Sequence, residues 1–175
     1  WDSHTAGGSA YLLAGTRTEA KLLNTLARRH ASEAGHLTGA TLDLRGRPLQ
    51  VGDRIVLLRN MGEQLDLDTG ARCRVDNGMI ATITHIHHHS SDINIELGNG
   101  RHLQLTGDYV QAGCIDHGYA TTIHKAQGLT CDDIYVVGPA GLYRESGYVA
   151  LSRARNTAHL YVTTRDAANI AEPTH

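Results

Sequence analysis

The apolar positions near the N-terminus predict one strand followed by one helix. The run Tyr11–Ala14 is short and apolar, as in a buried strand. Thr16 and Glu19 then have the spacing of a capping box, in which each side chain satisfies a backbone N–H at a helix start. Residues 10–34 therefore predict a strand–turn–helix unit, typical of α/β folds, that stops near Gly35. The apolar stripe of the helix consists of Leu22, Leu23, Leu26, Ala27 and Ala31.

From Gly46 to about Val110 the pattern changes to short β-like runs separated by turns. In the longest run, alternation places Ile83 on one side and Ile86 on the other. Asn77-Gly78 is a tight-turn signal, because both residues tolerate positive φ. Four or five short strands at this spacing predict a small barrel of the SH3-like or OB-like kind. The runs are Asp53–Arg59, Met79–His87, Ile93–Leu97 and His102–Leu105.

Alternation of strand and helix returns after this block. Tyr119–Ile123 and Ile134–Val137 predict buried strands, Ser146–Arg155 a helix, and His159–Thr163 a last strand. The predicted fold is therefore α/β, with one parallel sheet and its helices split by an inserted small β-barrel. The expected boundaries are 10–45 and 111–166 for the α/β domain, 46–110 for the barrel, and 1–9 and 167–175 for flexible ends.

Composition narrows the chemistry. The net charge of −2 and the 41% hydrophobic content indicate a folded protein whose bulk charge does not point to nucleic acid. Lys21 and Lys125 are the only lysines, and neither lies in a Gly-Lys-Ser/Thr sequence, so the chain has no P-loop. Any main phosphate cradle must come from another domain. The chain begins at Trp1 instead of Met, and we expect a piece of a longer protein.

The cysteines and the lengths of the apolar runs indicate the cellular compartment of the protein. Cys73, Cys114 and Cys131 are odd in number and contain no Cys-x-x-Cys, which favours a reducing, cytoplasmic setting over a disulfide framework. No apolar run approaches the length of a membrane span, so we expect no membrane partner.

Three segments place polar or cationic side chains at the ends of predicted elements. Arg17, in the first segment, follows the first strand. It could also be an ordinary solvated surface arginine, and the same holds for the two arginines of the third segment. In parallel sheets, ligands collect at the carboxyl ends of strands, so the three segments together favour one shared rim. The second segment holds His124, Lys125, Gln127 and Gly128, which could also form a simple polar turn, and the third holds Arg153 and Arg155.

In order and sequence, these segments resemble motifs IV, V and VI of the second RecA-like domain of superfamily 1 DNA helicases. Gly15-Thr16-Arg17 resembles motif IV, Thr122–Gly128 motif V and Val149–Arg155 motif VI. The middle block, with Gly52-Asp53-Arg54-Ile55, is similar to the barrel inserted into this domain in the RecD-like branch. The resemblance covers about residues 10–165 and is greatest to the helicase half of conjugative relaxases of the TraA/MobF type.

This resemblance implies a composite ATP site. ATP and Mg²⁺ would be bound mainly by the N-terminal RecA-like domain of the same parent chain, and the present chain would contribute arginines. Arg17 and Arg153 match the catalytic arginines that reach the γ-phosphate, and Thr130 replaces a glutamate that contacts the ribose in many relatives. The remaining implied contacts are Gln127, Gly128 and Arg155 for the nucleotide, and Thr121, Thr122, His124 and Lys125 for single-stranded DNA.

Two features of the middle block have competing explanations. Its arginines could follow the phosphates of single-stranded DNA, or they could be solvated on a scaffolding barrel. The histidines at 85 and 87–89 could bind a transition metal, but we expect an exposed strand end and no metal site. The arginines are Arg47, Arg54, Arg59, Arg72, Arg74 and Arg101.

The sequence thus favours half of an ATP-dependent DNA helicase, inactive alone, that the resemblance assigns to 5′→3′ translocation. Two alternatives remain: a non-catalytic module that binds nucleic acid or protein, and a purely structural domain. ATP hydrolysis by the longer protein would distinguish the helicase from these two alternatives.

Overall fold

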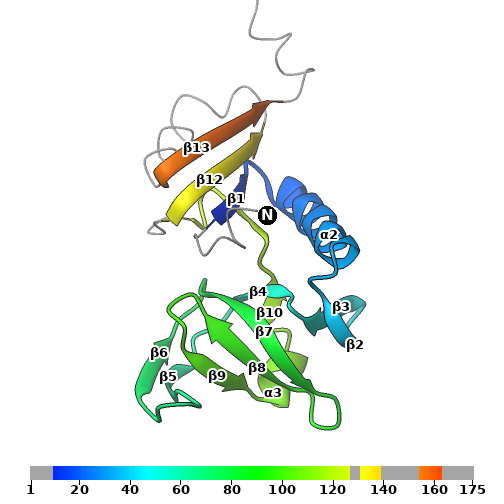
Figure 1. The fold of residues 1–175 in the computed structure, drawn as a ribbon, viewed down its shortest axis with the longest axis vertical. Coiled ribbons are helices and arrows are strands. Elements are labelled where there is room, and N and C mark those ends of the chain that lie inside the picture. The colour runs from blue at the N-terminus through cyan, green and yellow to red at the C-terminus, as the bar shows by residue number, and fades with distance from the viewer. Residues whose placement is uncertain (1–9, 127–130, 139–153, 163–175) are drawn as a thin grey trace, which may run out of the picture. The chain divides into compact units, whose positions relative to one another are not determined.

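The computed structural model describes residues 10–126, 131–138 and 154–162, and the chain divides into two compact units (Figure 1). The first unit comprises the described residues up to Leu26 and from Tyr119 onward, and the second comprises Ala27–Gly118. Each unit has its own sheet and its own apolar core.

The first unit contains a four-stranded, fully parallel sheet in the order β11-β1-β12-β13. This sheet confirms the predicted α/β class with a parallel sheet. Figure 1 shows β12 and β13 side by side with their arrows in the same direction. The strands are β1 (Ala10–Ala14), β11 (Ala120–Thr122), β12 (Cys131–Gly138) and β13 (Ala154–Val162).

The core of this unit lies on one side of the sheet. Leu13 of β1 and Ile134 and Val136 of β12 are buried there, and Ile123 and Ala126 pack against them from the segment after β11. Burial on this side holds the segment after β11 against the sheet.

Helix α2 (Arg17–Glu33) begins where the capping box predicts, and its inward face matches the predicted stripe in part. Leu23, Ala27 and Ala31 of that stripe are buried or half-buried, whereas Leu22 and Leu26 are exposed, at 58% and 39%. The inward face also includes Ala20 and Asn24, at helical spacing from the others.

The predicted helix Ser146–Arg155 is wrong at its end, because Ala154 and Arg155 are the first residues of β13. The rest of that segment lies outside the described residues. The predicted strand His159–Thr163 is thus the second half of a strand that starts five residues earlier.

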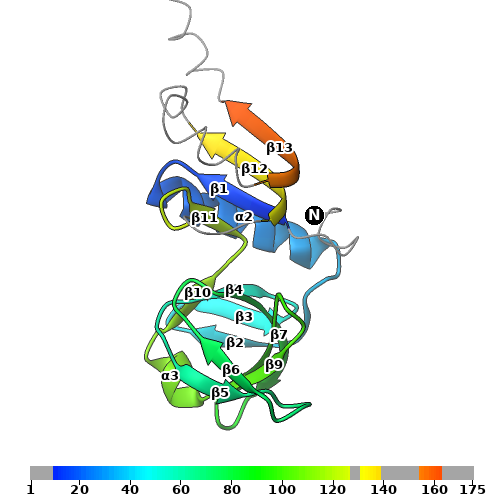
Figure 2. The ribbon, with the colours of Figure 1, turned by 90° about the vertical axis from the view of Figure 1, so that its left-hand side faces the viewer.

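The second unit is antiparallel β structure with one short helix. Five strands form a sheet in the order β10-β4-β7-β8-β9, and β2-β3 and β5-β6 form separate two-stranded hairpins (Figure 2). The predicted strands are present as β4, β7, β8 and β9, whereas β10, the two hairpins and α3 were not predicted. The elements are β2 (Thr38–Leu44), β3 (Arg47–Val51), β4 (Arg54–Leu57), β5 (Gly62–Leu65), β6 (Arg72–Val75), β7 (Ile80–His87), β8 (Asp92–Leu97), β9 (His102–Leu105), α3 (Gly107–Gln111) and β10 (Ile115–His117).

Strand β7 does not keep the alternation that its sequence predicts. The pairing with β8 shifts between Ile83 and His85, as at a β-bulge. Ile83 and Ile86 are therefore both buried, although strict alternation puts them on opposite sides.

The sharp turn between β3 and β4 contacts helix α2 and the residues that follow it. The carboxylate of Asp53 is fully buried, accepts a bond from Gln50 N–H, and lies 3.0 Å from Nε of Arg28. Gly52 precedes it at φ +93°, and a Cβ there would lie 2.2 Å from the His36 carbonyl oxygen. Only glycine fits this approach, because the neighbouring atom is backbone and cannot swing away.

The β5-β6 hairpin is fastened to β9 around His102. The Leu67 N–H donates to the His102 carbonyl, and the His102 N–H donates to Asp66. On the side chain, Nδ1 of His102 lies 2.5 Å from Asp68, and Nε2 lies 3.8 Å from Glu96 of β8. The hydrogen bond to Asp68 raises the pKa of His102 above its ordinary value.

The Gly52 contact predicts an unequal pair of glycine substitutions. Gly52→Ala should destabilise the chain by more than about 2 kcal/mol, because strain at positive φ adds to a backbone clash. Gly46→Ala is the matched control: Gly46 also has positive φ, but a Cβ there meets nothing within 4 Å. Its cost should be about 1 kcal/mol. Urea unfolding measures both, and equal costs would contradict the contact.

The His102 contacts predict that the hairpin loosens as pH rises. A raised pKa in the folded state gives stability that is complete below the ordinary histidine pKa and is lost as pH rises through the folded pKa. Protection of the Leu67 amide, corrected for intrinsic exchange, should therefore fall as pH rises above the ordinary histidine pKa of about 6.5. In His102→Asn it should be low and nearly constant. A wild-type profile as flat as that of the variant would refute the role of the imidazole.

Candidate nucleotide and DNA site

Parallel register brings two of the sequence-predicted segments to one edge of the first sheet. Ala14, the last residue of β1, pairs with Thr122, the last residue of β11. The Ile123 N–H also donates to the Ala14 carbonyl at 3.1 Å. Arg17 follows β1 by three residues, and Lys125 follows β11 by three, so both lie just beyond the carboxyl ends of adjacent strands. This is the edge at which ligands collect in parallel α/β sheets.

Arg17 is the first residue of α2, and its backbone is fixed by the helix cap. The Glu19 N–H donates to the Thr16 hydroxyl at 3.2 Å, and the Thr16 N–H donates to the Glu19 carboxylate at 2.8 Å. The Arg17 side chain is exposed. A guanidinium at a helix N-terminus combines a permanent charge with the positive end of the helix dipole, which suits a phosphate group.

Buried and exposed side chains follow one another at the end of β11 and in the turn after it. Thr122 and Ile123 are buried, whereas His124 and Lys125 are exposed. The Ala126 N–H then closes a turn onto the Thr122 carbonyl at 3.1 Å. Thr121 of β11 is half-buried. The turn thus directs two polar side chains outward from an anchored backbone.

Asn24 joins the two segments through its side-chain amide. Its Oδ1 accepts a bond from the Ala120 N–H, and its Nδ2 donates to the Ala120 carbonyl, both at 2.9 Å. Nδ2 also donates to the carbonyl of Ala20, one turn earlier in α2. The sequence reasoning missed this residue. The available signal was a polar side chain on the face that also carries Ala20, Ala27 and Ala31.

Arg155 lies in β13, the outermost strand on the side of the sheet opposite β11. It is near the beginning of β13, where Ala154 pairs with Cys131, and its Nη1 is 3.8 Å from Asp132. The carboxyl ends of β1 and β11 are at the opposite end of these strands, so the structure does not bring Arg155 together with Arg17 and Lys125. Gln127, Gly128 and Arg153 lie outside the described residues, as does Thr130.

Several arginines of the second unit are engaged by carboxylates. Arg72 lies 2.6 Å from Glu63 and Arg74 lies 2.9 Å from Asp76, and bonding to Asp76 raises the pKa of Arg74. Both pairs are largely exposed, and such pairs contribute little stability. The phosphate-tracking role of these arginines stays a prediction.

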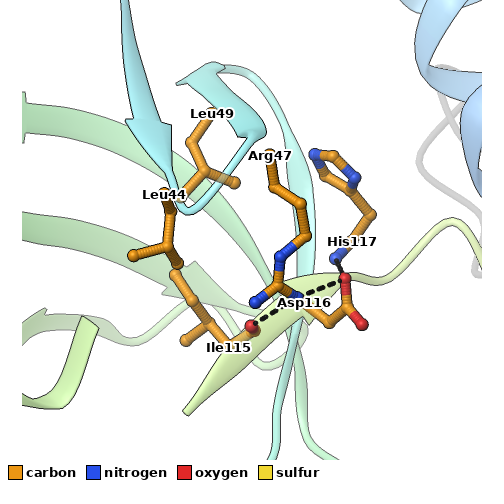
Figure 3. A pocket seen from close by; sticks show the side chains of 6 residues that line it. All are labelled: Leu44, Arg47, Leu49, Ile115, Asp116 and His117. Carbon is orange, nitrogen blue, oxygen red and sulfur yellow. Dashed lines mark hydrogen bonds and ion pairs between the residues drawn. The ribbon is translucent and has the colours of Figure 1, made fainter. Parts of the chain in front are cut away.

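Figure 3 shows Arg47 across a small hollow beside β10. Its Nη1 lies 2.9 Å from Asp116 and 3.3 Å from the Ile115 carbonyl oxygen. The guanidinium of Arg47 thus bonds to β10 within the second unit. This arginine has a structural role there, whereas the side chain of Arg17 is exposed.

The histidine-rich segment lies at the end of β7 and in the turn to β8. The rings of His85 and His87 are 4.6 Å apart edge to face, and Nε2 of His87 is 3.3 Å from Asn94 Oδ1. Within the described ranges, no three His, Cys, Asp or Glu side chains come together as a metal ion would require. No helix of the described parts is long and apolar enough to cross a membrane.

Comparisons with known proteins agree with the motifs. Residues 117–161 match the family model of the UvrD-like helicase C-terminal domain. Conjugal transfer protein TraA of Rhizobium radiobacter is 33% identical over 158 residues, which cover 88% of this chain and 13% of the relative. TraA of Agrobacterium fabrum is 33% identical over 162 residues, covering 90% of this chain and 14% of the relative. The chain therefore spans about a seventh of these relatives.

Two solved helicases have a similar fold. Pif1 helicase from Bacteroides, in complex with ADP-AlF3 and ssDNA, gives a TM-score of 0.52 at 19% identity, over 91% of this chain and 42% of that one. Pif1 helicase from Candida albicans gives 0.53 at 16% identity, over 95% and 48%. At these identities the likeness concerns the fold alone.

The helix cap predicts how Arg17 is held. Thr16→Ala should cost about 1 kcal/mol of unfolding free energy and raise amide exchange at Glu19, because the first turn loses its cap. The exposed neighbour Thr18→Ala is the control and should change neither quantity appreciably. Hydrogen exchange by NMR reports both, and an unchanged Glu19 amide in Thr16→Ala would refute the cap.

Proposed function

Since the chain is a superfamily 1 helicase C-terminal domain related to the TraA conjugal transfer proteins, we propose that it is the second motor domain of an ATP-dependent DNA helicase. One observation carries the proposal: Arg17 and Lys125 follow adjacent parallel strands that end level with each other. A cation that senses phosphate and a turn that contacts DNA are thereby neighbours, as coupling of hydrolysis to movement requires.

The proposed nucleotide site is shared between domains. Arg17 is exposed, permanently charged and at a helix N-terminus, so it fits the terminal phosphate of a bound ATP. ATP supplies the phosphoryl group whose transfer to water releases the energy for movement. Arg17, together with Arg153, would stabilise the charge on that group in the transition state, as arginine fingers do in other NTPases. The absent P-loop and the Mg²⁺ ligands belong, on this proposal, to an N-terminal RecA-like domain.

The proposed DNA contacts are Thr121, Thr122, His124 and Lys125. Lys125 offers an ammonium group for a phosphate, and His124 offers ring nitrogens that can form hydrogen bonds with DNA. Thr122 is itself buried, so its contribution would be to hold the backbone of the turn that contacts DNA. Gln127 and Gly128 are proposed to contact the nucleotide. The Bacteroides Pif1 helicase structure holds single-stranded DNA, which supports single-stranded DNA as the class of ligand.

We further propose that the second unit is the SH3-like barrel inserted into the motor domain, with 46–110 as its centre. Its antiparallel five-stranded sheet and two hairpins support this assignment, and the compact unit extends beyond those bounds on both sides. A position in the helicase half of a relaxase, and 5′→3′ translocation, are proposed from the same family resemblance.

Substitution of Arg17 in the longer parent protein tests the motor role. Arg17→Ala should lower the rate of ATP hydrolysis on the order of 10³-fold and leave ATP affinity nearly unchanged, because the role is confined to the transition state. Steady-state hydrolysis and nucleotide titration measure the two quantities. Arg29→Ala is the control, since Arg29 is an exposed arginine of the same helix that only faces Glu33.

Two results would contradict the motor role. Vigorous hydrolysis by the present chain alone would show that it has a complete nucleotide site. Equal losses of affinity and rate in Arg17→Ala would assign this arginine to ground-state binding or to structure. A parent without ATP hydrolysis that still binds single-stranded DNA would favour the non-catalytic binding module.

A further inference from the structure

Strand β11 is held by few contacts for a strand that carries a proposed DNA-binding turn. It has three residues and lies at the edge of the sheet, where β1 is the one strand among the described residues that pairs with it. A slip of one residue would turn every side chain of this strand to the opposite face. Burial of Ile123 and Ala126 holds the segment after the strand, and a contact at the first residue of β11 would fix its other end.

Asn24 provides that contact. Its side-chain amide bonds to both backbone groups of Ala120, the first residue of β11, in the way that a neighbouring strand would. Two bonds to one residue oppose a slip of one position, because the residues directly before and after Ala120 direct their backbone N–H and C=O groups to the opposite edge of the strand. The bond to the Ala20 carbonyl fixes the Asn24 amide itself on α2.

The same helix carries Arg17. Arg17 and Asn24 are seven residues apart, or about two turns, so they lie on nearly the same side of α2. The Ile123 N–H to Ala14 carbonyl bond fixes the other end of β11. The backbone between these two anchors is therefore set relative to the helix that begins with Arg17.

We infer that Asn24 is a positioning residue that fixes the register of β11 against α2 and so keeps Lys125 and His124 level with Arg17. The inference rests on the proposed motor function for its consequence. Binding of DNA at the turn would then be coupled to Arg17 through the backbone of β11, the Asn24 side chain and helix α2.

The first test measures the bridge in the 175-residue chain. Asn24→Leu keeps the side-chain volume and removes all three bonds, and it should raise amide exchange at Ala120 by about 10- to 100-fold. Asn24→Asp keeps an acceptor for the Ala120 N–H but turns an oxygen toward two carbonyls, so it should be no better than Asn24→Leu. Thr25→Ala, which loses a bond confined to α2, should leave Ala120 unchanged.

The second test measures coupling in the longer parent protein. The ratio of hydrolysis with and without saturating single-stranded DNA should fall at least about fivefold in Asn24→Leu, with the rate without DNA and the KM for ATP unchanged. General loss of structure would instead lower both rates together. Thr25→Ala should keep the wild-type ratio.

The outcomes are separable. Faster exchange at Ala120 together with a lower ratio supports the inference. Unchanged exchange, or faster exchange with a wild-type ratio, overturns it, and so does wild-type behaviour of Asn24→Asp. If single-stranded DNA does not change the rate of ATP hydrolysis by the wild-type parent, the proposed function is overturned instead. Amide exchange at Ala120 still decides whether the hydrogen bonds between Asn24 and Ala120 exist.

Discussion

The parallel pairing of β1 with its two neighbours is the constraint on which the candidate site depends. β1 lies between β11 and β12, and its register makes Ala14 level with Thr122 on one side and Val137 on the other. Parallel strands need crossover connections, so segments far apart in the chain meet at one edge. For this reason Arg17 and Lys125, more than one hundred residues apart in the chain, both follow strands that end side by side.

Features encoded by nearby residues were predictable. The capping box of Thr16 and Glu19 involves residues three apart, and the structure contains both of its hydrogen bonds. β1 and β12 contain short apolar runs, and β8 alternates apolar and polar residues, so the local pattern of each strand predicts its burial. The parallel class could also be predicted, because strand–helix alternation leaves few other arrangements.

Features decided by distant partners were not predictable. β5 has the sequence Gly-Glu-Gln-Leu and is mostly exposed, so no apolar run marks it, and pairing with β6 defines it. In α2, Leu22 and Leu26 looked like core residues, but small side chains and Asn24 face inward, since the helix lies close enough for an amide to reach β11. The end of the predicted helix at Arg155 was wrong for a similar reason: pairing with β12 overrides the local helical pattern.

The ion pairs of the β5-β6 hairpin give the second unit internal counterions. Glu63 and Asp76 already neutralise Arg72 and Arg74, as small anions in the surrounding solution would otherwise do. A nucleic-acid phosphate that reached either arginine would first have to displace its carboxylate. That carboxylate is covalently tethered to the protein, so it would stay near the phosphate and repel it. The hairpin therefore offers an approaching phosphate less net positive charge than its two arginines suggest.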